Sequence, residues 1–155
     1  MKVIGFILLV VGGWGISLCL VKDMKQNLLT WSACGDLIRF VRLQIDCFLC
    51  PQDRIFDTFT HPLLEQNGLL PALREGRGME EAVKGMVNEK LQELLLGFGR
   101  ELGQGYREEQ LRVCDFYLTQ ITEYKDYEAE QLSSKIKIKR TICMAGAMLI
   151  GLLFL

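Results

Sequence analysis

The Cys-x-x-Cys motif at Cys47 and Cys50 is the arrangement in this chain best suited to chemistry. Two thiols at this spacing can form a redox-active disulfide or supply half of a zinc site. A redox motif of the thioredoxin type opens a helix after a strand, whereas the apolar periodicity before Cys47 predicts that this motif closes a helix. A zinc ion needs two more ligands, and His61 with Cys34 or Cys114 would supply them without the usual paired spacing. We therefore interpret the cysteines as structural and expect no metal or cofactor, with a membrane-tethered thiol-redox or metal-binding protein as the alternative.

Adjacent carboxylates occur at Glu80–Glu81 and at Glu108–Glu109. Neighbours on a helix point about 100 degrees apart, so such a pair cannot share one substrate proton. The same residues suit the first turn of a helix, where negative charge meets the positive end of the dipole. The glycines between positions 97 and 105 lack the Lys and Ser or Thr of a phosphate loop. We predict that the chain is not an enzyme.

Both ends of the chain are much more apolar than its middle. Residues 3–21 form a run without charged side chains, and this run is long enough for a transmembrane helix. Residues 141–155 are also uncharged, and Ile136 and Ile138 extend this run to about 20 residues if the neighbouring lysines reach back to the headgroups. We predict three parts: an N-terminal transmembrane helix over residues 1–22, a cytosolic helical domain over 23–135 and a C-terminal transmembrane helix over 136–155.

Basic residues beside the two spans predict which way the chain faces. Six of them flank the middle domain, against Lys2 alone on the other side: Lys22, Lys25, Lys135, Lys137, Lys139 and Arg140. Positive charge favours the cytoplasmic side, so we expect the middle domain in the cytoplasm. The last four residues of that set are expected to anchor the C-terminal span at the membrane surface. With no other basic patch, nothing indicates nucleic acid as a partner.

Small residues four apart lie within each predicted span. They are Gly13 and Ser17 in the first, and Ala147 and Gly151 in the second. Small side chains at this spacing let another helix approach closely. We therefore expect packing between the spans or against a partner in the membrane.

The middle segment shows helical periodicity throughout and no strand pattern. Apolar stripes at spacings of three and four run from Leu28 to Phe48, from Leu91 to Leu102 and from Leu111 to Ile121. Gly103 suits the end of the second stripe, so the last two stripes predict an antiparallel hairpin. The fold class is an all-α antiparallel bundle whose long last helix continues into the C-terminal span. The acidic stretch 123–130 predicts a solvated spacer, unless exposed apolar residues there make it a docking face.

Six residues at the predicted hairpin turn carry a family likeness. Phe98, Leu102, Gly103, Gln104, Arg107 and Gln110 stand in the order Phe-x-x-x-Leu-Gly-Gln-x-x-Arg-x-x-Gln. This motif, with the length of the chain and the spans predicted at both ends, resembles the stage III sporulation protein AB family. The family pattern has an Asp where Tyr106 stands, suited to cap the last helix, and we expect Gly105 to serve as a weaker cap.

Proteins of this family are similar to the F protein of type II secretion systems and type IV pilus machines, a helical inner-membrane platform. The resemblance implies a place in the sporulation channel complex between mother cell and forespore. It implies as partners a secretion-type ATPase and other membrane proteins of that complex. We therefore expect a non-enzymatic scaffold or adaptor in the cell membrane, with its soluble domain on the mother-cell side. The expected mechanism is mechanical coupling through the last helix, and the sequence leaves homo-oligomer formation open.

Overall fold

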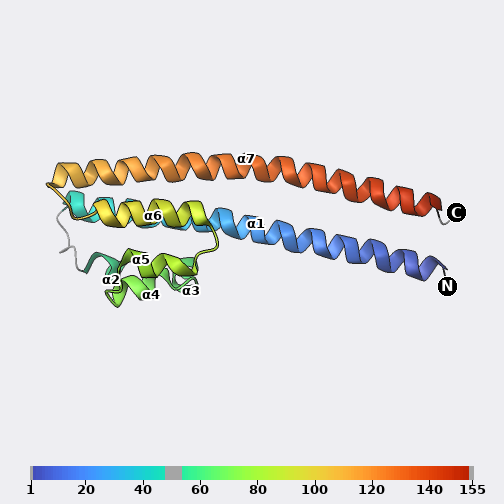
Figure 1. Ribbon diagram of the computed structural model, residues 1–155, viewed down its shortest axis with the longest axis horizontal. Helices are drawn as coiled ribbons and strands as arrows, with labels where there is room; N and C mark the ends of the chain where they lie inside the picture. The colour runs from blue at the N-terminus through green and yellow to red at the C-terminus, as the bar shows by residue number, and fades with distance from the viewer. Residues whose placement is uncertain (1, 48–53, 154–155) are drawn as a thin grey trace. The chain divides into compact units, whose positions relative to one another are not determined.

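The structure is a computed structural model that describes the backbone of residues 2–47 and 54–153 (Figure 1). Side chains are described for residues 22, 24–47, 54–138, 141–142 and 146. The chain forms two units. We call Leu29–Asp126 the helical unit, and Met1–Leu28 together with Tyr127–Leu155 the terminal unit.

All regular structure within the described residues is helical, as predicted for an all-α chain. The elements, in chain order, are α1 (Lys2–Cys47), α2 (Ile55–Thr58), α3 (Pro62–Gln66), α4 (Leu69–Arg74), α5 (Gly78–Ala82), the 3-10 helix η2 (Val83–Gly85), α6 (Glu89–Glu101) and α7 (Arg107–Leu153). The helical unit therefore combines parts of two long helices with the short helices between them.

The core of the helical unit is built on the inward face of α1. Its predicted apolar stripe is confirmed from Trp31 to Ile45, because these residues are all at most 9% exposed: Trp31, Cys34, Leu37, Ile38, Val41 and Ile45. Leu28, where the predicted stripe begins, is half-buried and belongs to the terminal unit. Phe48, the next residue of the pattern, lies outside the described residues. The aromatic ring of Trp31 stacks on Tyr124 of α7, with ring centroids 5.9 Å apart. The two long helices thus share one apolar seam in this unit.

The short helices between α1 and α6 cover this core. The glycines and prolines between His61 and Gly78 predict short helices joined by turns, and two such turns are confirmed at Gly68 and Gly76, which have φ of 78° and 72°, a conformation open mainly to glycine. The sequence predicts one helix over residues 79–87 with Glu80 and Glu81 in its first turn, but the observed helices end earlier: α5 and η2 end at Gly85, and Met86 is extended. The reason lies in the next helix: Asn88 must also be extended for its side chain to cap α6.

The last two helices of the unit form the predicted antiparallel hairpin (Figure 1). Leu91, Leu95 and Phe98 of α6 are fully buried, and Leu94 and Leu102 are half-buried. On α7, Cys114 and Ile121 are buried as expected, with Leu111 and Leu118 at the edge of the core. Two apolar stripes at helical spacing therefore meet as the sequence indicates.

The terminal unit contains the first part of α1 and the last part of α7, which run in opposite directions (Figure 1). Ile138 and Ile142 on α7 are 58% and 63% exposed. No helix within the described residues has a stretch long and apolar enough to cross a membrane. The spans predicted over 1–22 and 136–155 fall mainly on residues whose side chains lie outside the described set.

Candidate interaction site between α6 and α7

The local sequence at both ends of α6 fixes the helix that carries the site. At its start, the Asn88 side chain accepts a hydrogen bond from the Leu91 backbone N–H at 3.0 Å, which satisfies a donor that the first turn leaves open. The helix ends at Glu101, and Gly103 follows with φ of 85°. The predicted left-handed glycine is therefore confirmed, although the helix ends two residues before it.

The six residues of the family-like motif come together at the turn between α6 and α7. Phe98 is fully buried, and Leu102 is half-buried beside it. The Gln104 side chain donates to the Arg100 carbonyl at 2.6 Å, and the Gln110 side chain donates to the Gly105 carbonyl at 3.1 Å. These bonds occupy backbone carbonyls that the turn would otherwise leave without a partner.

Arg107 connects this turn to the end of α1. Its guanidinium donates to the Asp46 carbonyl at 2.8 Å and also pairs with the Asp46 carboxylate. Arg42, one turn earlier on α1, pairs with Asp115 of α7 through Nε and Oδ1 at 2.6 Å. Among the residues whose side chains are described, two ion pairs therefore join α1 to α7, and the motif arginine takes part in one of them. Exposed pairs of this kind contribute at most about 1 kcal/mol, so we interpret them as fixing the register of the helices.

Tyr106 directly precedes α7, and Glu109 completes the cap of this helix. The Tyr106 carbonyl accepts from the Gln110 N–H at 3.0 Å, while the Tyr106 N–H donates to the Glu109 carboxylate at 3.2 Å. This is the acidic half of a capping box, without the side-chain cap on the first residue. The expectation that Gly105 caps the helix is therefore wrong, because the carboxylate three residues further on satisfies the Tyr106 N–H.

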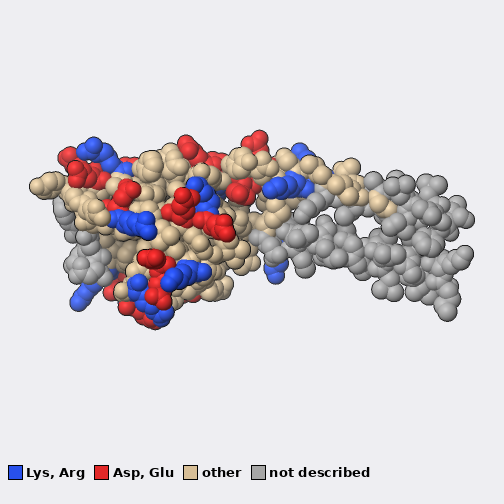
Figure 2. All heavy atoms as spheres, in the orientation of Figure 1, with Lys and Arg blue, Asp and Glu red and all other residues tan. Residues whose placement is uncertain are grey.

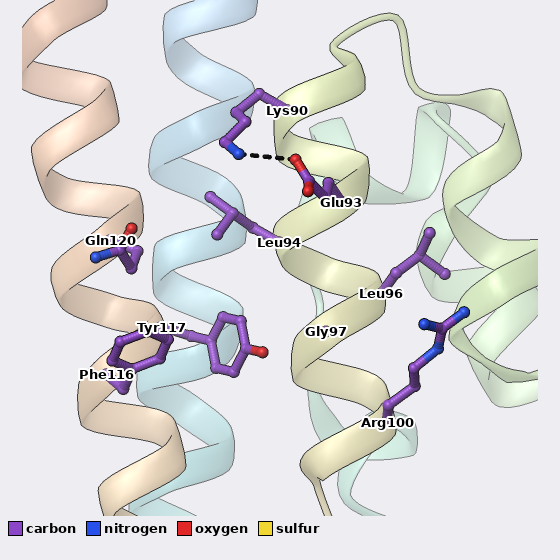
Figure 3. Close-up of a pocket in the computed structure, with 9 residues that line it drawn as sticks. All are labelled: Lys90, Glu93, Leu94, Leu96, Gly97, Arg100, Phe116, Tyr117 and Gln120. Atoms are coloured by element: carbon purple, nitrogen blue, oxygen red, sulfur yellow. Dashed lines mark hydrogen bonds and ion pairs between the residues drawn. The ribbon is translucent and has the colours of Figure 1, made fainter.

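A shallow groove of about 360 Å³ lies between α6 and α7 (Figure 3). Its walls come from two faces of the hairpin and are formed by Lys90, Glu93, Leu94, Leu96, Gly97, Arg100, Phe116, Tyr117 and Gln120. At one end Lys90 pairs with Glu93 at 2.7 Å, and its ammonium lies 5.4 Å from the centre of the Tyr124 ring. The Phe116 ring, although large and apolar, is 56% exposed.

The floor of the groove depends on close contact between Gly97 and Tyr117. A Cβ on Gly97 would overlap the Tyr117 hydroxyl oxygen and lie 3.2 Å from two ring carbons. The Tyr117 ring meets Phe98 edge-on at 5.7 Å, and its hydroxyl donates to Glu101 at 3.0 Å. Burial, and then this bond to Glu101, raises the pKa of Tyr117 to about 12. Tyr117 therefore keeps its proton at neutral pH and serves as a fixed wall.

The groove is suited to binding another polypeptide. Its centre is apolar and its two ends carry charged side chains, which resembles the core and rim of a protein interface. The charged lining residues, Lys90, Glu93 and Arg100, are all exposed. Side chains of this kind recognise a partner by shape and charge.

The cysteines whose side chains are described fall into two groups. Cys34 and Cys114 are buried and free, and burial raises their pKa to about 12 and about 11. Cys47 is exposed and free at the last residue of α1, while Cys50 lies outside the described residues. Within the described part of the chain, no three His, Cys, Asp or Glu side chains converge as metal ligands.

The residues predicted to act at the membrane lie in the terminal unit. Lys135 and Lys137 are exposed on α7. The side chains of the others lie outside the described residues: Lys139 and Arg140 near the predicted surface, and Gly13, Ser17, Ala147 and Gly151 within the predicted spans. Their expected roles therefore stay predictions.

Sequence reasoning missed the groove. Tyr117 is only 6% exposed and stands three residues after Cys114, so its helical spacing could have placed it in the core. Gly97 gave a second signal, because a glycine inside a helix costs about 1 kcal/mol relative to alanine and often marks a close approach. Nothing in the sequence indicated that Phe116 would be exposed.

Comparisons with known proteins bring no relative to this chain: no family model, curated protein or solved structure matches it. The resemblance to the stage III sporulation protein AB family therefore stays a prediction from the sequence.

Substituting Gly97→Ala should destabilise the protein by about 1–3 kcal/mol, because the new methyl group overlaps the Tyr117 hydroxyl. The control is Gly35→Ala, whose Cβ would lie 3.5 Å from Ile121, an ordinary contact, so its stability should stay equal or rise by up to about 1 kcal/mol. Urea unfolding followed by circular dichroism measures both. Adding Tyr117→Phe should recover part of the loss, and a Gly97→Ala variant as stable as wild type would contradict the close contact.

The raised pKa of Tyr117 predicts a loss of stability at alkaline pH. The folded value of about 12 exceeds the ordinary value of 10, so the unfolded chain releases this proton first. The stabilisation is complete below pH 10 and is lost as the pH rises towards 12. Urea midpoints of wild type and Tyr117→Phe, measured from pH 8 to the alkaline limit of folding, should show the advantage of wild type shrinking above pH 10. An advantage independent of pH would count against the buried hydroxyl.

Proposed function

We propose that this chain is a non-enzymatic membrane scaffold or adaptor of a secretion-like sporulation complex between mother cell and forespore. Its two terminal segments act as membrane spans and hold the helical unit on the cytoplasmic, mother-cell side. The helical unit docks a cytosolic secretion-type ATPase and other membrane proteins of the same complex. Its contribution is position and contact, and the chemistry belongs to the partner.

The observation that carries this proposal is α7, a single helix from Arg107 to Leu153. Within the helical unit its inward residues Cys114, Tyr117 and Ile121 are buried, so this part of the helix is held in a packed core. The same helix continues through the exposed Lys135 and Lys137. Because each turn of a helix is hydrogen-bonded to the next, a displacement of one part is passed along it. This supports mechanical coupling between a docked ATPase and partners in the membrane.

The distribution of charge supports the membrane anchors. Acidic residues outnumber basic ones within residues 29–126, while basic residues outnumber acidic ones in the two terminal stretches. Lysines beside an apolar segment are attracted to the anionic cytoplasmic leaflet. The uncharged run at residues 3–21 has the length that a bilayer core requires.

A thiol-dependent function is the second candidate, because the Cys47 thiol is exposed and free. Its position at the end of α1 does not favour it, since the C-terminal end of a helix carries partial negative charge and does not stabilise a thiolate. Replacing Cys47 and Cys50 by serine separates the two candidates. A scaffold keeps its activity after this change, whereas a thiol or metal protein loses it.

Replacing Ser133 and Ser134 by glycine tests the coupling. Both side chains are exposed on α7, and two glycines weaken the helix locally by about 2 kcal/mol relative to two alanines. In an endospore-forming host that depends on this chain, the glycine pair should lower sporulation severalfold. The chain should still stay with the membrane on alkaline extraction and still bring down the ATPase.

The matched control replaces the same serines by alanine, which keeps the length, register and helicity of α7. This variant should sporulate like wild type. Equal sporulation of the glycine and alanine pairs would argue against coupling through α7. Release of the wild-type chain from membranes at alkaline pH would argue against the anchors instead.

A further inference from the structure

The outward face of α6 has an ordered pattern of charge. It consists of Glu89, Glu93, Leu96 and Arg100, whose spacings of four, three and four place them within an arc of about 60 degrees. The three charged residues are exposed and Leu96 is half-buried, whereas Leu91, Leu95 and Phe98 on the opposite side are buried. This face is therefore acidic in its first half, apolar at its middle and basic in its second half.

The charges on this face are not paired with each other along the helix. Glu93 and Arg100 are seven residues apart, about 10 Å along the axis, which is too far for an ion pair. Among the described residues Arg100 has no carboxylate partner, and its contact is the backbone bond from Gln104. Lys90 pairs with one oxygen of Glu93, and a carboxylate can accept further bonds at the other oxygen.

The groove beside this face supplies apolar contact. Figure 3 shows Gly97 on α6, between Leu94 and Leu96 and opposite Tyr117 of α7, with the Phe116 ring on the far side of Tyr117. The Phe116 ring is 56% exposed, so much of it is available for contact with another surface. Figure 2 shows acidic and basic side chains close together on the same side of the helical unit, with uncharged surface between them.

We propose that this face is the contact between two copies of the chain, with their α6 helices antiparallel. If the two-fold axis passes near Leu96 and Gly97, Arg100 of each copy meets Glu93 of the other, because each stands the same distance from the axis. The two Leu96 side chains meet at the centre, and Phe116 packs at the groove of the opposite copy. The arrangement is isologous, since the same surface serves both copies.

Charge complementarity identifies a second copy as the occupant. A partner of one sign would satisfy either Glu93 or Arg100 and would repel the other. An antiparallel copy presents Arg100 to Glu93 and Glu93 to Arg100, so the same ion pair forms twice. The inference goes beyond the scaffold role and does not depend on whether the terminal segments enter a membrane.

A charge-swap series on the full chain in detergent tests the proposal. Light scattering coupled to size-exclusion chromatography, over a range of concentrations, should give two chains per particle for wild type. Arg100→Glu and Glu93→Arg should each weaken the association by about tenfold or more, because each places like charges opposite one another. The double variant Arg100→Glu with Glu93→Arg should return the dimer to near wild-type strength. The control Lys84→Glu reverses an exposed charge on η2 and should leave the dimer unchanged.

Three results would overturn the proposal: one wild-type chain per particle at every concentration, single variants that dimerise like wild type, or a double variant no stronger than the singles. Circular dichroism confirms that each variant is folded. Leu96→Cys, with Cys19, Cys47, Cys50 and Cys143 replaced by serine, gives a second readout, because the remaining Cys34 and Cys114 are buried. Oxidation should link two chains through the residue near the axis, and a chain that stays unlinked would also overturn the pairing. Membrane extraction and the Ser133 and Ser134 variants report on the scaffold role separately.

Discussion

The burial of one face of α7 against α1 and α6 is the constraint on which the helical unit depends. Cys114, Tyr117 and Ile121 lie on this face, and each is at most 6% exposed. Tyr117 fits only because Gly97 opposite has no side chain. Large changes in such a close-packed region cost several kcal/mol, whereas the exposed ion pairs of α7 with α1 contribute much less. Packing therefore holds α7 in place, and the ion pairs select its register.

This arrangement leaves the outward surfaces of the hairpin for recognition. The groove between α6 and α7 and the outward face of α6 are adjacent, and both combine exposed charge with apolar side chains. The residues that sequence analysis associated with a family instead build the turn: Arg107 holds the end of α1, and Gln104 and Gln110 satisfy backbone carbonyls. Such a turn shapes the scaffold, and its neighbours on α6 and α7 present the contact surface.

Much of this fold could be predicted because its helices are amphipathic. Periodic apolar residues located α1, α6 and the start of α7, and Gly103 located the turn between them. Helix ends were less predictable. The helix before α6 ends at Gly85, and the Asn88 side chain then caps α6. At the start of α7, the Glu109 carboxylate accepts from the Tyr106 N–H, where no side-chain cap is present. Apolar periodicity does not reveal such local hydrogen bonds. The groove was missed because it depends on how two helices approach in space. The exposure of Phe116 follows from that approach.

The continuity of α7 is the claim on which the proposed scaffold role depends most. Amide hydrogen exchange of the full chain, read by mass spectrometry of overlapping peptides, measures it directly because a break in a helix exposes its N–H groups. The account predicts slow exchange that continues from the helical unit through Asp126 and Tyr127, where the two units meet in sequence, and on past Ser134. Rapid exchange confined to that junction, with protection on both sides, would contradict it.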